Sequence, residues 1–350
     1  MKLRAVFLIV PCVLIGAACV AQAQEAGGAF YKGKTVDLIV SSGVGGGQDA
    51  NARLIARHWP RRIPGAPAMV VKNMPGAGHL RAANFMANQA PRDGTVVAAL
   101  VPSFVLSQVL QTSKNIQFDA AQFSWLGASA ANNSTFYVWN TSPVKTMEDA
   151  RTHETLMGAT GAGSYTMIYP AIMNAIAGTK FKIVLGYKST AEVNLALERG
   201  EVQGRAGNNF NSLKMENGDW LRDRKITLIA QVGLERDPEF PDLPLMMEFG
   251  RTPEDRALLK LFSADIALGR PFLTTPGVPA DRVEILRKSF MDTMNDPALL
   301  KEAQDSGVEI APVRGAKLQE IVKEIVATPP EVARRAREAL AVAEGGAPAR

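Results

Sequence analysis

Short runs of β-branched and other apolar residues alternate along the chain with glycine loops and with longer segments of helical apolar spacing. Each run has the length of one strand, and the spacing that follows it predicts a helix. The predicted strands cover residues 36–40, 68–72, 94–101, 156–159 and 181–185. Strands that alternate with helices over about 250 residues indicate an α/β fold with mostly parallel sheets.

Two predicted helices carry recognisable capping residues. Gly200 stands where a C-terminal glycine cap belongs, after a segment in which Val193 and Leu197 share one side. Near the end of the chain, residues 328–331 resemble a capping box with a proline in the first turn. We expect structural roles for the C-terminal helices, because they combine a core stripe with surface charge.

The beginning of the chain has the pattern of a secretory signal. Lys2 and Arg4 precede the apolar run 5–20, and small residues up to Ala23 fit a cleavage site. Proline and glycine interrupt the run, which is shorter than the roughly 20 apolar residues of a membrane span. We therefore expect a signal peptide at 1–23, cleaved near Ala23, and a periplasmic protein; an uncleaved anchor is the alternative.

Both cysteines, Cys12 and Cys19, lie in this leader, so the mature chain is expected to have neither a disulfide nor a thiol nucleophile. Lipid attachment at Cys19 is disfavoured, because Gly16 stands where a leucine-like residue is wanted. Without the two basic leader residues, 37 of 39 basic residues remain against 34 acidic ones, a net charge of +3. This balance gives no argument for nucleic acid or a membrane surface.

Common nucleotide and metal motifs are absent or misplaced. Residues 28–35 match GxxxxGK[ST], but a strand-like run follows them where a phosphate loop needs a helix. The glycines at 43–47 miss the GxGxxG spacing, because Gln48 occupies its last position. No HExxH, paired cysteine or calcium-loop spacing occurs, so we expect no metal and no cofactor.

Catalytic residues are also hard to assign. Ser164 lacks the GxSxG context, and only three histidines occur. We expect His58 and His153 to face solvent, whereas His79 could line a cleft. An exported hydrolase that uses Ser164 or His79 therefore stays an alternative without a triad to support it.

Three glycine-rich loops follow predicted strands, the position at which open α/β sheets bind ligands. Free amides from Ser42 to Gly47, backed by a helix that starts at Gln48 or Asp49, can hold a carboxylate without a basic side chain. Hydroxyl groups that add donors belong to Ser41, Ser42, Ser103, Ser164 and Tyr165. The glycines could instead serve only tight turns, but three such loops in one exported chain favour binding.

These residues resemble a known family, the extracytoplasmic substrate-binding proteins of tripartite tricarboxylate transporters, or Bug family. The resemblance covers nearly the whole mature chain, from residue 31 to residue 331. Its markers in chain order are GGGQDANARLIARH, IPGAPAMVVKNMPGAG, APRDGTVV, TSPVKT, GATGAGS, GTKFKIVLGY, EVNLALERGEVQGR, PDLPLM and TPGVPADR. Each marker is modest alone, and their colinear order is specific.

The resemblance implies a type II periplasmic binding protein fold, in which two α/β lobes with a hinge-side cleft close on a small ligand. Chains of this family typically cross the hinge twice, which implies a first lobe of residues 25–135 and 232–350 and a second lobe of residues 136–231. Family ligands are mostly carboxylates, including dicarboxylates, tricarboxylates, aromatic acids and acidic amino acids.

The resemblance also implies the ligand-binding residues. The first-lobe loop would contribute Ser42, Gly43, Val44, Gly46, Gly47 and Asp49. The second-lobe loop would contribute Gly161, Gly163, Ser164 and Tyr165, while Pro75, Gly76, Ala77 and Gly78 border the cleft and Ser103 supports it. For Asp49 we expect helix capping and loop shaping, because a carboxylate repels an anionic ligand.

Two further expected ligand-binding residues depart from the family pattern. Other members have an aspartate at the position of Gln203, which could pair with an amine, so Gln203 weakens the case for an amino-acid ligand. A related branch has tryptophans and a cysteine near 206–210, whereas this chain has Asn208 there, which implies a more polar pocket wall.

The leading hypothesis is a periplasmic solute-binding protein that captures a small organic carboxylate for the integral membrane subunits of a tripartite tricarboxylate-type transporter. It is expected to be a monomer, to bind no nucleic acid and not to be an enzyme. The second hypothesis is a ligand-sensing module for a membrane receptor kinase, which sequence alone does not separate from transport.

Overall fold

The computed structural model describes residues 30–45, 47–110, 114–160, 164–187 and 189–343. The predicted signal peptide, both cysteines and three predicted site residues, Gly46, Gly161 and Gly163, lie outside the described residues. The strands are β1 Thr35–Val40, β2 Ala68–Asn73, β3 Val96–Ala99, β4 Ser124–Ala128, β5 Ser134–Trp139, β6 Thr155–Gly158, β7 Phe181–Val184, β8 Gly204–Asn209, β9 Ile226–Val232, β10 Pro271–Thr274 and β11 Val313–Arg314. The α-helices are α2 Gly47–His58, α3 Leu80–Asn88, α4 Ser103–Leu110, α5 Asp149–Thr152, α6 Tyr165–Ile172, α7 Thr190–Glu198, α8 Phe210–Arg222, α9 Pro253–Leu268, α10 Ala280–Met294, α11 Pro297–Asp305, α12 Gly315–Val326 and α13 Pro330–Ala343.

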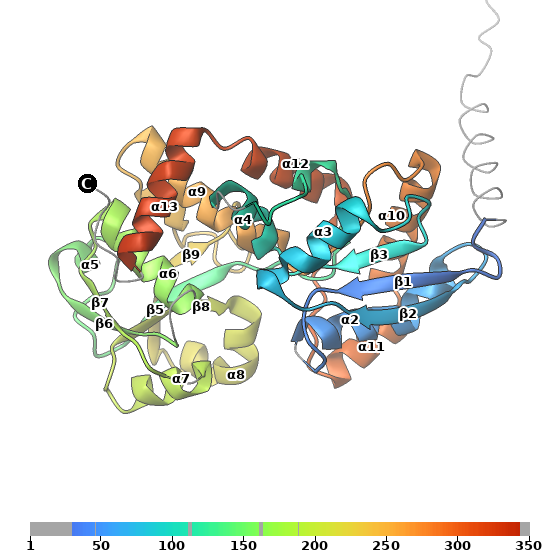
Figure 1. Ribbon diagram of the computed structural model, residues 1–350. Helices are drawn as coiled ribbons and strands as arrows, with labels where there is room; N and C mark the ends of the chain where they lie inside the picture. Colours follow the sequence, from blue (N-terminus) through green and yellow to red (C-terminus); the bar gives the residue numbers. More distant parts are fainter. Residues whose placement is uncertain (1–29, 46, 111–113, 161–163, 188, 344–350) are drawn as a thin grey trace, which may run out of the picture.

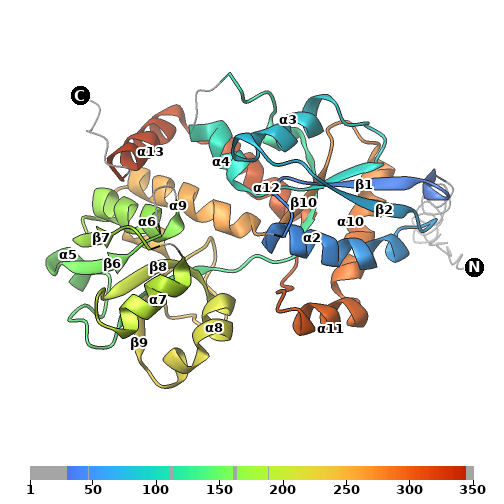
Figure 2. The same ribbon diagram turned by 60° about the horizontal axis from the view of Figure 1, so that its bottom comes forward.

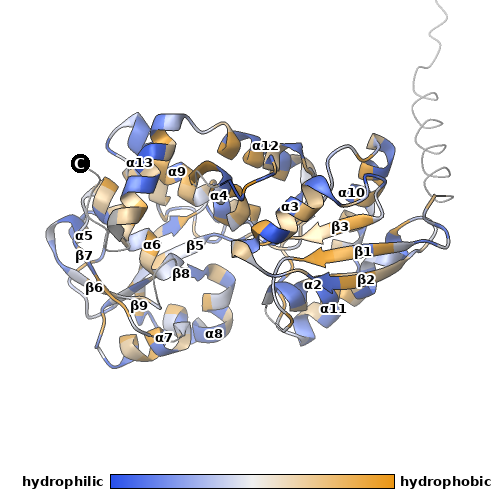
Figure 3. Ribbon diagram, viewed as in Figure 1, coloured by the Kyte–Doolittle hydropathy of each residue, from blue (hydrophilic) through white to orange (hydrophobic). Residues whose placement is uncertain are grey.

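The strands form two sheets, one on each side of the molecule (Figure 1). The first sheet has the order β11-β4-β10-β3-β1-β2, and the second has the order β7-β6-β8-β5-β9. Strand β1 shows how the first sheet is buried: Val36 and Leu38 pack in one hydrophobic cluster with α2 and α10, and Ile39 packs in another. Helices therefore cover both faces of this sheet, and Figure 3 shows β1 as a hydrophobic strand beside the more hydrophilic α2.

The chain passes between the sheets twice, at 129–133 and at 233–270 (Figure 2). Backbone hydrogen bonds hold these connections together, since the Arg270 amide donates to Ala130 O at 2.8 Å and the Ala311 amide donates to Ser129 O at 2.9 Å. We call this region the junction. The predicted two-lobed α/β architecture is present, and the exact lobe boundaries stay a prediction.

The predicted mostly parallel pairing is wrong, because each sheet mixes both directions. Strands β1, β2 and β3 pair in parallel, as do β6, β7 and β8. By contrast, β10 is antiparallel to both of its neighbours, β11 is antiparallel to β4, and β5 is antiparallel to β8 and β9. Strands β5, β10 and β11 begin at the junction, so they run opposite to neighbours whose carboxyl ends point toward it.

The predicted capping box near the C-terminus is also wrong. The hydroxyl of Thr328 donates to Ile325 O at 2.6 Å, which closes the end of α12, and α13 then opens with Pro330. A capping box does occur at the start of α9, where Thr252 and Asp255 bond each other's backbone. Among the described residues, none of the helices has the length and apolar character that crossing a membrane requires.

Candidate functional site

A cavity of about 320 Å³ lies where both sheets meet the junction. It is bounded by the start of α2, by residues after β3 and after α11, by the start of α6 and α8, and by both connections. Its lining comprises Gln48, Val101, Pro102, Ala130, Ala131, Asn132, Tyr165, Asn209, Ser212, Met215, Asp265, Ile266, Gly269, Arg270, Gly307 and Glu309. This is the cleft at the carboxyl ends of strands in which open α/β sheets bind ligands.

The turn between β1 and α2 is shaped by Asp49. Its carboxylate accepts hydrogen bonds from the Gly45 amide at 2.9 Å, from Arg53 Nε at 2.9 Å and from Asn73 Nδ2 at 2.8 Å. Burial alone would raise the pKa of Asp49, but these hydrogen bonds outweigh it and lower the pKa to about 2. The charge of Asp49 is therefore used within the turn.

Backbone and side-chain bonds at Ser41 join the neighbouring loops to this turn. Its hydroxyl accepts from the Val101 amide at 2.9 Å, and its carbonyl accepts from His79 Nδ1 at 3.0 Å. Gly76 and Gly78 belong to the same loop as His79 and have φ of 132° and 60°, but they do not line the 320 Å³ cavity. Hydrogen bonds to Ser41 thus join the loops that contain Val101 and His79 to the end of β1.

The turn itself is open. Gly43 and Gly47 are exposed, and the Val44 side chain is 77% exposed at the tip. Two groups nearby are buried without a hydrogen-bond partner, the Ser42 hydroxyl and the Gln48 side-chain amide nitrogen. Buried polar groups usually have partners. Gln48 lines the cavity, so its amide nitrogen is available to a ligand there, whereas Ser42 is not among the lining residues.

On the second-sheet side, α6 brings Tyr165 into the cleft. The tyrosine hydroxyl donates a hydrogen bond to Asp265 Oδ2 of α9. The adjacent Ser164 hydroxyl lies 2.7 Å from Thr166 Oγ1. Ser103 does not line this cleft and instead lines a neighbouring cavity of about 440 Å³, which Tyr165 and Asp265 also border.

Tyr165 is the described residue of the expected set that lines the 320 Å³ cavity. The other described residues of that set do not line it and stay predictions: Ser42, Gly43, Val44, Gly47, Asp49, Gly76, Gly78, Ser103, Ser164, Gln203 and Asn208. Gln203 precedes β8 at the end of that strand away from the junction, where its Oε1 accepts from the Leu156 amide at 3.1 Å. Asn208 is buried, and Thr135 Oγ1 donates to its carbonyl at 2.9 Å. The cleft residue of β8 is its neighbour, Asn209. Side chains alternate between sheet faces, so a shift of one position changes the environment completely.

Arg270 is the basic residue among those that line the cleft, and it is not among the residues predicted from the sequence. Its Nη2 lies 3.9 Å from the place of a Cβ on Gly47, at the start of α2. Among the described residues, its guanidinium has no hydrogen-bond or ion-pair partner, and burial lowers its pKa. A partly buried cation without a partner, beside the positive end of a helix, is a site that an anion completes.

The position of Arg270 depends on the glycine before it. Gly269 has φ of 57°, and a Cβ there would lie 1.9 Å from Ala130 O. The glycine thereby lets the chain approach the first connection, and the Arg270 carbonyl accepts from the Ser129 amide at 3.1 Å. The available signal in the sequence was a single arginine between the mostly apolar end of one helix, at residues 261–268, and an apolar strand at residues 271–274.

Two acids share the cleft with Arg270. Asp265 is 1% exposed, and burial raises its pKa to about 6. Glu309 accepts hydrogen bonds from the side-chain amides of Asn132 and Asn211, and burial raises its pKa as well. The apolar run around Asp265 was a second signal that the sequence analysis did not use.

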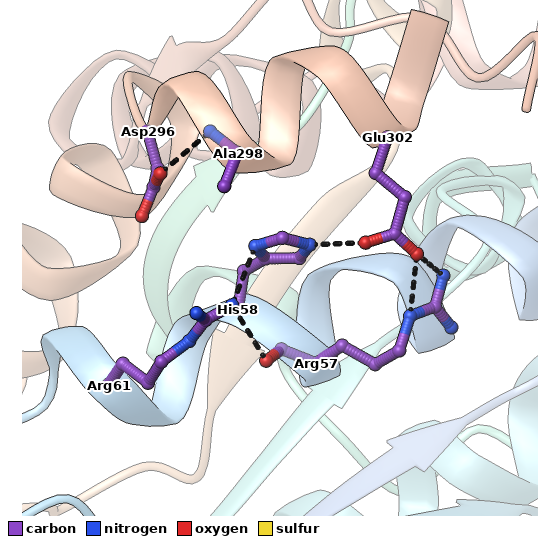
Figure 4. A network of polar contacts seen from close by, with 6 residues as sticks. All are labelled: Arg57, His58, Arg61, Asp296, Ala298 and Glu302. Carbon is purple, nitrogen blue, oxygen red and sulfur yellow. Dashed lines mark hydrogen bonds and ion pairs between the residues drawn. The ribbon is translucent and has the colours of Figure 1, made fainter. Parts of the chain in front are cut away.

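The prediction that His58 faces solvent is wrong. Its side chain is buried between α2 and α11, with Nε2 2.6 Å from Glu302 Oε2 and Nδ1 3.0 Å from Arg61 Nη2 (Figure 4). Arg57 also bonds Glu302, so this network fastens two helices at the periphery of the first sheet. No group of three or more potential metal ligands occurs in the described part of the chain.

Comparison with known proteins identifies a family for the chain. Residues 52–335 match the model of the tripartite tricarboxylate transporter family receptor. The UPF0065 protein in the gbd 5'region of Cupriavidus necator is 27% identical over 225 residues, which are 62% of this chain and 64% of that protein. The chain therefore spans slightly less than two thirds of the length of this curated relative.

Solved structures share the fold. A TctC solute binding protein from Polaromonas, without ligand, has a TM-score of 0.67 at 18% identity, over 87% of this chain and 99% of that one. Rpa4515 of R. palustris, solved with adipate, has a TM-score of 0.53 at 22% identity, over 90% of this chain and 99% of that one. They confirm the predicted binding-protein fold, and the family match, which covers most of the sequence, shows that the chain belongs to the tripartite tricarboxylate transporter family of receptors.

Proposed function

We propose that this protein is a periplasmic receptor that captures a small organic carboxylate in the cleft and delivers it to integral membrane transporter subunits. It acts by binding and release, as a monomer and without catalysis. The two lobes, residues 25–135 with 232–350 and residues 136–231, close around the ligand, which shifts the population toward the closed form.

The observation that carries this proposal is the unpaired Arg270 guanidinium beside the start of α2. Together with the Gln48 side-chain amide nitrogen, it provides donors and positive charge on the cleft wall, and among the described residues no carboxylate is within ion-pair distance of it, although Glu309 influences its charge. Charge-assisted hydrogen bonds contribute about 1.5–3 kcal/mol each, so three or four approach the roughly 8 kcal/mol of micromolar binding. Membership in a transporter receptor family and the adipate in Rpa4515 support a carboxylate as the ligand.

Calorimetric titration of the mature protein with a panel of carboxylates tests the proposal. We expect at least one micromolar ligand whose affinity falls about 100-fold in Arg270→Met, because the paired charge and its hydrogen bonds are lost. Arg222→Met removes the same charge from an exposed residue whose ion-pair partner is Asp223, and should leave binding unchanged. Failure of every carboxylate to bind, or equal binding by Arg270→Met, would overturn the proposal.

A further inference from the structure

The acidic side of the cleft narrows the class of ligand. Asp265 is almost fully buried and uses only Oδ2, which accepts from the Tyr165 hydroxyl. Its other oxygen, Oδ1, is buried without a hydrogen-bond partner. Burying half of a carboxylate without a partner is costly, and Asp265 lines the same cavity as Arg270. Asp265 therefore has one carboxylate oxygen that still needs a hydrogen-bond donor.

Glu309 forms a second acceptor on the cleft wall. The amides of Asn132 and Asn211 both donate to its Oε1, which leaves Oε2 without a hydrogen bond among the described residues. The three charged side chains that line the cavity are thus one cation and two acids. Burial raises the pKa of both carboxyl groups, because it disfavours their charged forms.

This set of charges does not suit a dianion. A dicarboxylate would bring two further negative charges to a cavity that one guanidinium and two acids already line. A hydroxyl group could donate to Asp265 Oδ1 but would leave the buried charge unpaired. A protonated amine would satisfy the oxygen and the charge together, because an ammonium group has three donors.

We propose that the ligand is a small amino carboxylate, whose carboxylate binds Arg270 and the start of α2 and whose ammonium group binds Asp265, with Glu309 as a further acceptor. This rests on the proposed carboxylate-binding function. The objection that Gln203 raised against an amine no longer holds, since Gln203 lies outside the cleft. A cavity of about 320 Å³ also limits the ligand to a small molecule.

Titration with matched acids tests the proposal directly. The pairs are aspartate and succinate, glutamate and glutarate, alanine and propionate, and 6-aminohexanoate and hexanoate, which vary the spacing between amine and carboxylate. We expect the tightest ligand to carry an amine and to bind at least 10-fold more tightly than its deaminated partner. If in every pair the deaminated acid binds as tightly as its amine-carrying partner or more tightly, the ammonium proposal is wrong. The same holds if only dicarboxylates bind. In both cases the carboxylate function stands.

Two isosteric variants assign the roles. Asp265→Asn keeps an acceptor for Tyr165 but removes the charge, so it should abolish the preference for the amine and leave the affinity for the deaminated acid unchanged or higher. Glu309→Gln should reduce the same preference several-fold, and it serves if Asp265→Asn does not fold. Glu154→Gln, at an exposed acid 3.8 Å from Lys182, is the control. If both cleft variants keep the preference for the amine, the roles assigned to Asp265 and Glu309 are wrong. If the wild type binds no carboxylate at all, the proposed function is wrong instead.

Discussion

The hydroxyl of Tyr165 donates a hydrogen bond to Asp265, and this bond joins the start of α6 to the last turn of α9. It links a helix of the second sheet with α9, which is part of the second connection between the sheets. Asp265 is held in one position by this bond, yet its charge has no counterion among the described residues. The ionised carboxylate of Asp265 therefore lowers the stability of the unliganded folded protein.

The first prediction is that Asp265→Asn stabilises the unliganded protein at neutral pH. Burial raises the folded-state pKa from 3.8 to about 6, so the folded state binds a proton more tightly than the unfolded state. The contribution of Asp265 to the stability of the wild type should be most favourable below pH 4 and should fall as pH rises through 6, by up to about 3 kcal/mol for two pKa units. The variant should lack this fall.

Urea unfolding at pH 4.5 and pH 7.5 measures this difference. Asp223→Asn, at an exposed residue, is the control and should follow the wild type. A variant that is less stable than the wild type at both pH values would show that Asp265 serves the fold, not the ligand.

The second prediction concerns the pH dependence of binding. An ammonium ligand requires ionised Asp265, so its affinity should fall up to tenfold per pH unit below about pH 6. The other ionisable groups near this acid are Arg270, Glu309, Tyr165, Tyr169 and, on the neighbouring cavity, Arg337, and only Glu309 can lose charge in the same direction. Titration of wild type and Glu309→Gln between pH 4.5 and 8 separates the two acids. Equal affinity throughout that range would exclude an ammonium contact with either carboxylate.

The third prediction is that Gly269→Ala weakens both folding and ligand binding. The added Cβ would overlap Ala130 O, which is backbone and cannot turn away, and the residue has φ of 57°. We expect a loss of about 2–4 kcal/mol in the free energy of unfolding and a displaced Arg270. Gly200→Ala has a similar φ of 75° with open space around it, so it should lose only about 1 kcal/mol and bind normally. If both variants lose the same free energy of unfolding, the positive φ alone explains the need for glycine at position 269, and the contact with Ala130 O does not contribute.

The fourth prediction is that Asp49→Ala destabilises the β1–α2 turn. Its carboxylate accepts from Gly45, Arg53 and Asn73, and its pKa of about 2 means that this stability is present above pH 4 and lost as pH falls toward 2. We expect a loss of about 2–3 kcal/mol at pH 7. Asp37→Ala removes an exposed acid bonded to Lys72 and should cost less than about 1 kcal/mol. Similar losses would show that the turn does not depend on Asp49.

The sequence predicted most of the strand and helix positions around the first loop, because the apolar run and the glycines report directly on local structure. It did not predict strand direction, since β5 and β10 are set by where the chain changes sheets, which is a property of distant segments. The resemblance to a family placed Tyr165 among the site residues, and the structure places it in the cleft.

The charged residues of the cleft could not be found from loop motifs. Asp265 lies in a helix and Arg270 just after it, and both reach the cleft only because the second connection folds against the first. Gln203 and Asn208 were expected in the site because of their alignment with family residues. The residue of β8 that lines the cavity is instead Asn209, at the end of the strand. The position of a residue along its strand sets its distance from the junction, and a match to a sequence motif does not give that position.

The backbone of Arg270 is hydrogen-bonded within the segment that connects the two sheets, while its side chain reaches the opening turn of α2. In the proposed complex, the group that recognises the ligand is therefore part of the structure that sets the angle between the lobes. Recognition and closure would then need no relay of intermediate residues, and a substitution that stiffens this segment would change the speed of capture and release together with affinity.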